Sequence, residues 1–181
     1  MMNYKHWANV GEKHDLCFVT TTIEDFIPIF TIPDNARIIV SNLAFYRKRH
    51  GFLLHAYVVM PEHIHILLQL MGRIDLQRLM ASFKRYTAKQ LLQWCREQDK
   101  RDWLETFARR GAVDGEDYSV WQRSFRSVPI SGEQDALVKM EYIHGNPVRK
   151  GLVEYSQDWT YSSAAAYEGG SGPIRVDLIE P

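Results

Sequence analysis

The residues of this sequence most suited to chemistry are two histidines, His63 and His65, at the start of an aliphatic run. In an extended strand, alternate side chains point to the same face, so the two imidazoles would lie side by side while Ile64 and Ile66 point to the other face. Two neighbouring imidazoles on a rigid element form half of a metal site. A pair of solvated or hydrogen-bonded strand histidines is the simpler alternative for this motif taken alone.

A second pair of candidates, Tyr142 and Asn146, follows about eighty residues later. Because these residues are spaced four apart, their side chains share one face of a helix. A divalent cation held by two imidazoles and one amide or carboxylate oxygen keeps positions open for a phosphate oxygen. A tyrosine can be a covalent nucleophile, although its phenol, with a free pKa near about 10, needs a nearby cation or base. If the fold brings the two pairs together, they suit phosphodiester transfer.

Other residues of the same chemical types compete for these roles. Glu62 adjoins the histidines and could bind a metal, accept a hydrogen bond from an imidazole, or lie at the surface as a turn residue. His144 lies about 200° around a regular helix from Tyr142, which favours a structural role. Four further tyrosines could be the nucleophile by residue type: Tyr118, Tyr155, Tyr161 and Tyr167. Unlike Tyr142, none of them has an amide side chain one turn away on a clearly predicted helix.

Local patterns predict the elements that position the candidates, beginning with a strand and a helix. Residues 16–23 are rich in β-branched and aromatic residues, which is typical of a strand. A helix should begin after Pro33, with Asp34 or Asn35 as its cap, and end before Gly51. The apolar residues that recur at helical spacing are Ile38, Ile39, Leu43 and Tyr46.

A hairpin and a long helix should follow. Residues 52–60 and 63–70 are separated by two residues only, which predicts an antiparallel hairpin with the histidines at the start of its second strand. Beyond Gly72 the apolar residues recur with a helical period, and Asp75 is placed to cap the helix. The apolar stripe consists of Leu76, Leu79, Met80, Phe83, Leu91 and Trp94.

The second half of the chain is predicted to hold a loop, a strand and a helix. Residues 96–115 have mixed charges, and Gly111 with Asp114-Gly115 marks a loop there. Residues 118–129 resemble a strand in which Trp121 and Phe125 could stack on unpaired bases, with core packing as the alternative. A further helix carries Tyr142.

That helix has a predicted start and end. Ser131 and Gln134 have the spacing of a capping box, which would open the helix. Pro147 should stop or redirect it near Asn146. After it, residues 169–173 are typical of a flexible linker, which leads to a short tail.

Several basic side chains are candidates for contacts with nucleic-acid phosphates. They gather at the end of the first helix, on one side of the long helix, on the 118–129 strand and after Tyr142. A simpler alternative applies to the helical groups, since cations complement a helix C-terminus and basic faces are often only solvated. The candidates for phosphate contact are Arg47, Lys48, Arg49, Arg78, Arg85, Lys89, Arg123, Arg126, Arg149 and Lys150.

Length and composition favour one soluble domain in a reducing compartment. The chain of 181 residues can bury one hydrophobic core, and its 22 basic and 22 acidic side chains balance, so only local clusters can favour a nucleic-acid partner. Cys17 and Cys95 are too few for a disulfide framework. Residues 1–7 lack an apolar signal core, and no segment approaches the roughly 20 apolar residues of a membrane span, so we expect a cytoplasmic protein.

The order of elements predicts an α+β fold, a ferredoxin-like antiparallel sheet with helices packed on one face. The exposed face with His63 and His65 could then receive the helix with Tyr142. Residues 1–168 would form a single domain, and residues 169–181 a flexible linker and C-terminal tail. The meeting of the histidines and the tyrosine is the central hypothesis.

Two motifs carry a resemblance to a known family. One is Pro61-Glu62-His63-Ile64-His65, and the other, which begins at Tyr142, reads YIHGNPVRKGLV. In this order and spacing they resemble the single-tyrosine HUH transposases, particularly the REP-associated tyrosine transposases of the IS200-like group. The stretches WQRSF from Trp121 and WTYSS from Trp159 are also similar to that group, so the resemblance spans most of residues 15–165.

The resemblance implies the HUH endonuclease fold and the roles of four residues. His63 and His65 would be metal ligands, Asn146 would complete the metal site, and Tyr142 would be the nucleophile. Members of the family use Mg²⁺ or Mn²⁺, leave a 5′-phosphotyrosine and a free 3′-hydroxyl, and recognise hairpin-forming repeats. We therefore expect a metal-dependent single-stranded DNA endonuclease and strand transferase that acts on REP-like hairpin DNA as a monomer or homodimer.

Two other functions are compatible with the same residues. One is a hairpin-binding protein that keeps the fold but no longer cuts DNA. The other is a metallophosphoesterase that uses water instead of a tyrosine. A covalent protein–DNA adduct distinguishes the expected transferase from both, because neither alternative forms one.

Overall fold

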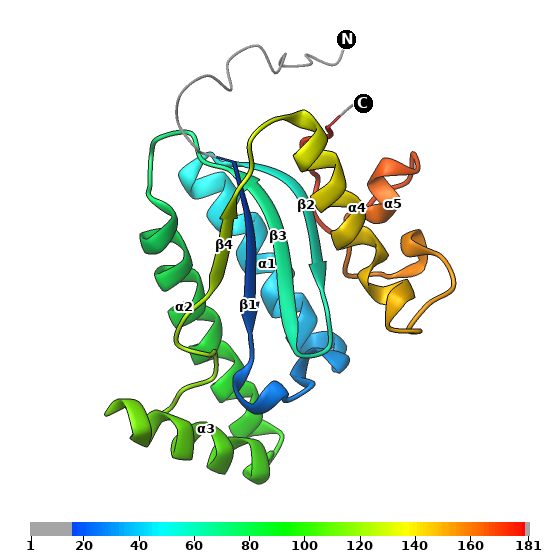
Figure 1. Ribbon diagram of the computed structural model, residues 1–181. Helices are drawn as coiled ribbons and strands as arrows, with labels where there is room; N and C mark the ends of the chain where they lie inside the picture. Colours follow the sequence, from blue (N-terminus) through cyan, green and yellow to red (C-terminus); the bar gives the residue numbers. More distant parts are fainter. Residues whose placement is uncertain (1–15, 180–181) are drawn as a thin grey trace.

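The computed structural model describes residues 16–179, which form a four-stranded antiparallel sheet (Figure 1). α1 (Pro33–His50) joins the first two strands, and α2 (Leu76–Glu97) with α3 (Arg101–Asp114) joins the last two. This is the ferredoxin-like arrangement, so the predicted α+β fold is confirmed. In the spatial order β2-β3-β1-β4, the strands are β2 (Leu53–Val59), β3 (His63–Gln69), β1 (Leu16–Thr22) and β4 (Arg126–Pro129).

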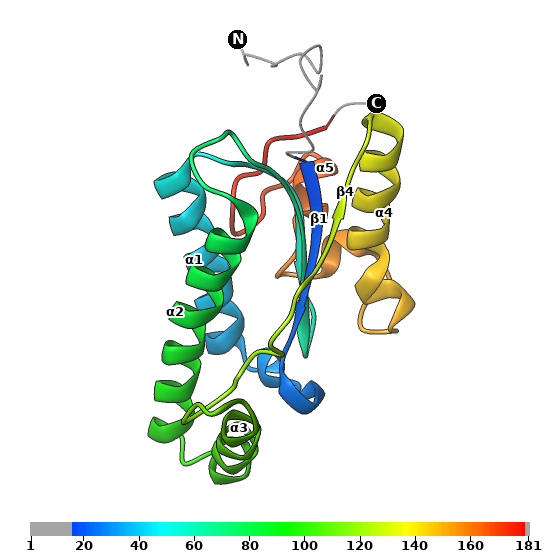
Figure 2. The same ribbon diagram turned by 60° about the vertical axis from the view of Figure 1, so that its left-hand side comes forward.

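Helices cover both faces of the sheet (Figure 2). α1 and α2 pack on the face to which Ile64, Ile66 and Leu68 point. α4 (Glu133–Arg149) packs on the other face, where its Ile143 belongs to a second apolar cluster with Phe18. The prediction of helices on one face holds for α1 and α2, while α4 takes the opposite face, as the central hypothesis requires.

The first two long helices begin in different ways. Asp75 caps α2 as predicted, since its carboxylate accepts a hydrogen bond from the backbone N–H of Arg78 at 2.8 Å. The predicted caps of α1 are wrong, because this helix begins after Ile32 without a side-chain cap. Asn35 instead donates its side-chain N–H to the carbonyl of Ile29 at 3.1 Å and is buried.

Most of residues 96–115 are helical, so the predicted loop is wrong. Gly111 lies within α3, where a Cβ atom would lie 2.6 Å from the Cα of Tyr118. The glycine therefore permits a close approach of two backbone segments rather than a turn. Gly115, with a φ of 74°, is the residue that ends the helix.

The strand predicted over residues 118–129 is much shorter in the structure, because only its last four residues form β4. Trp121 is buried, and its Nε1–H donates to the hydroxyl of Thr87 at 3.0 Å. Phe125 packs against the same core. Core packing, rather than exposure for base stacking, is thus the outcome for both aromatic residues.

α4 differs from its prediction at both ends. The capping box of Ser131 and Gln134 does not form, because the N-cap is Gly132, whose φ of 101° no other residue type adopts easily. Pro147 lies inside the last turn, and the helix continues to Arg149. The fixed φ of proline is helical, so near a helix end it removes one hydrogen bond without forcing a stop.

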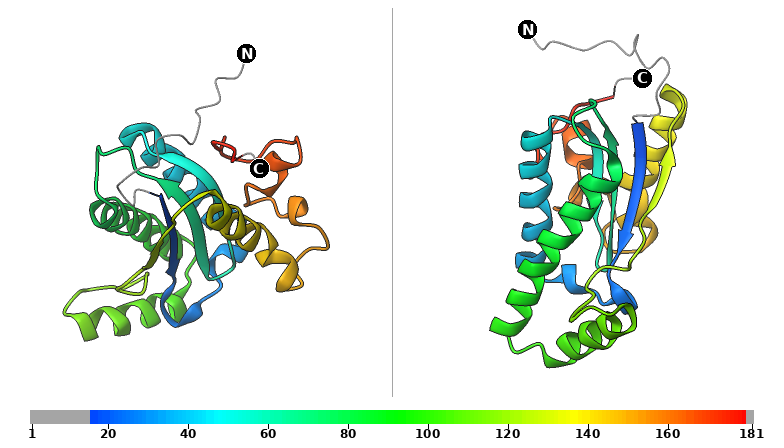
Figure 3. Two further views of the ribbon diagram at one scale, coloured as in Figure 1. Left: turned by 45° about the horizontal axis from the view of Figure 1, so that its top comes forward. Right: turned by 90° about the vertical axis from the view of Figure 1, so that its left-hand side faces the viewer.

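The last described residues, 174–179, are docked along the sheet edge (Figure 3). The prediction for residues 169–181 is a flexible linker and a C-terminal tail. The backbone N–H of Asp177 donates to the carbonyl of Leu54 in β2 at 2.8 Å, and its carboxylate accepts from the N–H of Leu54 at 2.9 Å. Ile174 and Ile179 are buried in the two different apolar clusters. The segment therefore covers part of an otherwise open strand edge.

Shorter elements complete the described chain: η2 (Glu24–Phe26), η3 (Ile29–Thr31), η4 (Ser156–Asp158) and α5 (Ala164–Tyr167). Both cysteine thiols are buried beneath the helices of the first face. Among residues 16–179, no helix has the length and apolar character needed to span a membrane. The N-terminal stretch for which the sequence predicts no signal core lies outside the described residues.

Candidate active site

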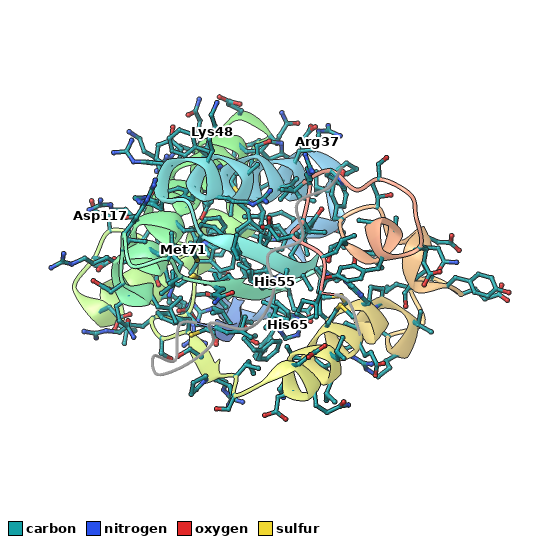
Figure 4. All side chains as sticks on the ribbon, turned by 90° about the horizontal axis from the view of Figure 1, so that it is seen from above. Arg37, Lys48, His55, His65, Met71 and Asp117 are labelled. Atoms are coloured by element: carbon teal, nitrogen blue, oxygen red, sulfur yellow. The ribbon has the colours of Figure 1, made fainter. Side chains whose placement is uncertain are left out.

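His63 and His65 lie side by side at the start of β3, as the strand alternation predicts; His65 is labelled in Figure 4. Their Nε2 atoms are 3.1 Å apart and their ring centroids 4.7 Å apart. His65 is only 5% exposed, and His63 is partly buried. Two ring nitrogens that meet in this way can bind one ion between them.

Each imidazole is held through its other nitrogen. Thr20 of β1 lies opposite His65 in the strand register, and its Oγ1 is 2.7 Å from Nδ1 of His65. Nδ1 of His63 is 3.0 Å from the carboxylate of Glu62, to which it can donate. Metal-binding histidines usually have such a partner, which fixes the ring and leaves Nε2 for the metal. Of the three roles considered for Glu62, the structure therefore favours that of a hydrogen-bond acceptor for the His63 ring.

Burial keeps both rings neutral. Burial, with smaller contributions from the neighbouring His63 and Arg149, lowers the pKa of His65 to about 3. Burial also lowers the pKa of His63, although the adjacent carboxylate of Glu62 opposes this shift. A metal binds the lone pair of a neutral imidazole, so at neutral pH both histidines are in the protonation state that metal binding needs.

Tyr142 of α4 lies against His65, so the fold brings together one member of each candidate pair. The two ring centroids are 5.5 Å apart. Phe18 of β1 completes an aromatic cluster, since it stacks on His65 at 5.3 Å and meets Tyr142 edge-on at 5.9 Å. Tyr142 is 43% exposed. Its ring is therefore held on one side and accessible to a substrate on the other.

Asn146 and Arg149 both bind the backbone at Tyr142. Asn146 is buried and donates its side-chain N–H to the carbonyl of Tyr142 at 2.9 Å. The guanidinium of Arg149 donates to the same carbonyl and lies over the Tyr142 ring, 4.6 Å from its centroid. Arg149 thus places a permanent positive charge beside the phenol, which is the kind of neighbour a tyrosine nucleophile needs.

The alternative tyrosines lie in other surroundings. Tyr161 and Tyr167 each donate their hydroxyl to a backbone carbonyl. Tyr118 packs under the guanidinium of an arginine in α2, and Tyr155 is exposed in the segment after α4. Of the five candidate tyrosines, Tyr142 is the one whose ring contacts the histidine pair.

His144 is buried on α4, and its Nε2 is 2.8 Å from the hydroxyl of Ser163, which fits the structural role predicted for it. Burial lowers its pKa to about 4. Below pH 6.5 the unfolded chain binds a proton at this residue while the folded chain does not, so the free energy of unfolding should fall by about 3 kcal/mol as the pH is lowered from 6.5 to 4. Urea unfolding across this range should show the wild type losing stability relative to His144→Gln, and parallel pH profiles would contradict this.

The basic candidates divide between the two faces of the sheet. Arg126 of β4 pairs in register with Thr20, which also pairs with His65, so the three side chains share one face. Arg149 and Lys150 at the end of α4 are close enough to the histidines to contribute to the lowering of their pKa values. These three basic residues therefore lie on the side of the candidate site.

Six other basic candidates, on α1 and α2, lie across the sheet from the histidine pair. α1 and α2 cover the opposite face, and Figure 4 shows Lys48 on the outer side of α1, across the sheet from His65. Several of these residues are in ion pairs, such as Arg47 with Asp177 at 2.7 Å. Those on α1 and α2 are Arg47, Lys48, Arg49, Arg78, Arg85 and Lys89. Arg123 lies in the segment before β4, where it is paired with Asp114 at 3.2 Å.

Three residues of the site were not predicted from the sequence: Phe18, Thr20 and Lys139. The ammonium of Lys139 lies 5.3 Å from the centroid of the Phe18 ring, at the edge of the aromatic cluster. Phe18 and Thr20 alternate on a predicted strand, so the sequence indicates that they share a face. Their contact with the histidines depends on the register between β1 and β3, which no local pattern specifies.

The fold and this arrangement of side chains define the class of protein. The family described as "Transposase IS200 like" matches residues 33–146, a range that includes both histidines, Tyr142 and Asn146, and the chain belongs to this family. A protein of Haemophilus influenzae, provisionally named a REP-associated tyrosine transposase, is 33% identical over 117 residues. That match covers 64% of this chain and 61% of the relative, so the chain spans about three fifths of the length of the curated relative it matches.

A solved structure has the same fold. It is a REP-associated tyrosine transposase bound to a REP hairpin, and it superposes with a TM-score of 0.62 at 21% sequence identity. The match covers 100% of this chain and 94% of that protein. The resemblance to REP-associated tyrosine transposases is thereby confirmed.

Proposed function

We propose that this protein is a metal-dependent endonuclease and strand transferase that cleaves repeat-derived hairpin DNA, in a single-stranded region, through a covalent link to Tyr142. The observation that carries the proposal is the contact of Tyr142 with His65, whose Nε2 meets that of His63. A nucleophile beside a pair of metal-binding nitrogens is an arrangement suited to phosphodiester transfer.

The residues fit a divalent cation such as Mg²⁺ or Mn²⁺. Both imidazoles have their Nδ1 atoms engaged and present Nε2 to a shared position. By its resemblance to the family, and one turn after Tyr142 on α4, Asn146 is the proposed third ligand through its amide oxygen. When bound, the cation would polarise the scissile phosphate and stabilise its developing charge.

The proposed step exchanges one phosphorus–oxygen bond for another. The phenolic oxygen of Tyr142 attacks the phosphorus, and the bond from phosphorus to the 3′-oxygen breaks. The phenol loses its proton to solvent, and the departing 3′-oxygen takes up a proton to become a 3′-hydroxyl. The phosphate remains on Tyr142 as a 5′-phosphotyrosine, and attack by a 3′-hydroxyl on this link rejoins the DNA.

Cationic side chains surround the proposed nucleophile. Arg149 lies over the Tyr142 ring, and Lys139 lies over the adjoining ring of Phe18. Positive charges at these positions would stabilise the phenoxide and pair with phosphate oxygens of the DNA. Local clustering of this kind lets a chain of balanced net charge bind a polyanion.

The choice of hairpin DNA as substrate rests on similarity. The solved relative with the same fold is bound to a REP hairpin. This chain shares its family, and its histidine face is lined by aromatic and basic side chains that suit unpaired bases and phosphates. We therefore propose a REP-like hairpin with a single-stranded flank as the DNA partner.

Adduct formation tests the proposed function. The protein is incubated with Mn²⁺ and a hairpin oligonucleotide that carries a single-stranded flank, with labels on both DNA ends. The expected result is a protein–DNA adduct that survives denaturation, together with a released strand that ends in a 3′-hydroxyl, and EDTA should prevent both. Binding without an adduct would instead identify a non-cleaving hairpin-binding protein, and turnover without an adduct a water-using phosphoesterase.

Arg126 should contribute a phosphate contact that Arg78 does not. Both side chains are exposed, but Arg126 shares the face of His65, whereas Arg78 extends from α2 on the opposite side and pairs with Asp75. Arg126→Ala should weaken hairpin binding. It should also lower the slope of log affinity against log salt concentration by about 1, while Arg78→Ala should change neither the affinity nor the slope. Fluorescence titrations at several salt concentrations measure both slopes, and equal effects of the two substitutions would refute this placement.

A further inference from the structure

The loop after β1 presents a phenylalanine to solvent. Phe26 in η2 is 66% exposed, even though it is a large aromatic residue. Single exposed apolar residues are common on protein surfaces, so exposure alone does not indicate a function. Two further observations distinguish this residue.

The first observation is backbone strain. Asp25 and Phe26 have φ values of 50° and 54°, in the left-handed region. For a bulky residue such as phenylalanine this conformation is an outlier, and outliers of this kind persist where the surrounding structure imposes them, often at functional sites. Glycine adopts the conformation freely. The loop thus has an aromatic ring at a position where folding alone favours glycine.

Contacts with α3 hold the strained conformation. The carboxylate of Asp25 accepts a hydrogen bond from Arg109 at 2.9 Å and from Nε of Arg110 at 2.7 Å. Hydrogen bonding to Arg110 is the main cause that lowers the pKa of Asp25, so the carboxylate stays charged. Glu24 balances the remaining positive charge at 3.6 Å from Arg110. The two carboxylates and two guanidinium groups carry no net charge together, so this cluster fixes the loop to α3 and is not an anion-binding site.

The second observation is the position of the loop beside the proposed active site. Its ends, Ile23 and Phe30, donate their backbone N–H groups to the carbonyls of residues 61–62 at 2.8 and 2.9 Å, in the turn that precedes His63. Figure 1 shows this loop below β1, between α3 and the turn that joins β2 to β3. Phe26 is three positions after Ile23 in the chain, so their Cα atoms are at most about 11 Å apart.

We infer that Phe26 is a stacking site for one unpaired base of the DNA strand bound at the histidine pair. This inference rests on the proposed function. Every base has an aromatic face, so an exposed ring binds single-stranded DNA by stacking without reading its sequence. A ring on a clamped backbone loses little conformational freedom on binding. Duplex DNA keeps its bases stacked on one another, so the ligand of this site is the single-stranded flank.

Fluorescence of a base analogue tests the inference. Hairpins with 2-aminopurine at successive positions of the flank are titrated with protein that also carries Tyr142→Phe, so that cleavage is not required. One position should be quenched on binding, and Phe26→Ala should remove this quenching and weaken affinity by about 10-fold or more. Phe26→Trp should retain both. The matched control is Phe45→Ala, which removes an exposed aromatic ring of α1 and should change neither.

Stability separates a binding role from a folding role. Phe26→Gly relieves the strained φ, so it should raise the Tm by about 2 to 4 °C while it weakens DNA binding as Phe26→Ala does. A lower Tm would show that the ring supports the fold, which would overturn the inference, as would unchanged quenching and affinity in Phe26→Ala. A failed adduct assay with the wild type would refute the proposed cleavage but leave the base-stacking result intact.

Discussion

Replacement of Tyr142 by phenylalanine should abolish the covalent protein–DNA adduct and leave hairpin binding unchanged. The substitution removes only the phenolic oxygen, because the ring that contacts His65 and Phe18 and lies under Arg149 is retained. Loss of a covalent nucleophile lowers the rate of such a reaction by at least about 1,000-fold, so the adduct should be undetectable. Denaturing gels with labelled hairpin measure the adduct, and fluorescence anisotropy measures binding.

The matched control is Tyr155→Phe, which removes the hydroxyl of another exposed tyrosine, in the segment after α4. This variant should form the adduct at the wild-type rate. An adduct that persists in Tyr142→Phe would disprove the nucleophile assignment, and peptide mapping of the adduct would then identify the residue that carries the DNA. Equal losses in both variants would indicate a general effect of the substitution rather than loss of the nucleophile.

Patterns within one element were sufficient to predict most of the sheet. The alternation through β3 places His63 and His65 on one face, and the two-residue connection before His63 leaves an antiparallel hairpin as the simplest arrangement. The helical period and the Asp75 cap likewise predict α2. These features depend on residues only a few positions apart, so a local sequence pattern is enough to predict them.

Features that depend on contacts between distant segments could not be predicted in this way. Gly111 has the appearance of a loop residue until the backbone at Tyr118 is known to lie against it. The docked tail depends on pairing between Asp177 and Leu54, which are 123 residues apart. A short apolar segment after a glycine-rich stretch carries no sign of such a partner.

The same limit applies to the candidate site. Strand alternation and helical spacing identified His65 and Tyr142 separately, but neither pattern specifies that α4 packs on the histidine face. The partners that hold the site, Phe18 and Thr20, come from β1, and their roles follow from its register with β3. Side chains with a recognisable chemical type can thus be predicted from sequence, whereas the residues that orient them require the fold.

Removal of the imidazole nitrogens at His65 should eliminate metal binding and, with it, the adduct. His65→Phe keeps an aromatic ring to stack on Phe18 but has no nitrogen to donate. Because a bound cation supplies several kcal/mol of stabilisation to the developing charge, adduct formation should fall on the order of 1,000-fold. Calorimetric titration with Mn²⁺ measures metal binding directly, and wild-type affinity in this variant would disprove the assignment of His65 as a ligand.

Two further variants separate ligation from general effects on the fold. Thr20→Val removes the hydroxyl 2.7 Å from Nδ1 of His65 but keeps the ring nitrogens, so Mn²⁺ affinity should fall by only about 10- to 100-fold. His144→Gln removes a buried histidine that bonds Ser163 instead, so it should keep full Mn²⁺ affinity. If the metal binds through His65, Mn²⁺ affinity should decrease in the order wild type, Thr20→Val, His65→Phe. The affinity of His144→Gln should equal that of the wild type. Equal affinities in all four proteins would place the metal elsewhere.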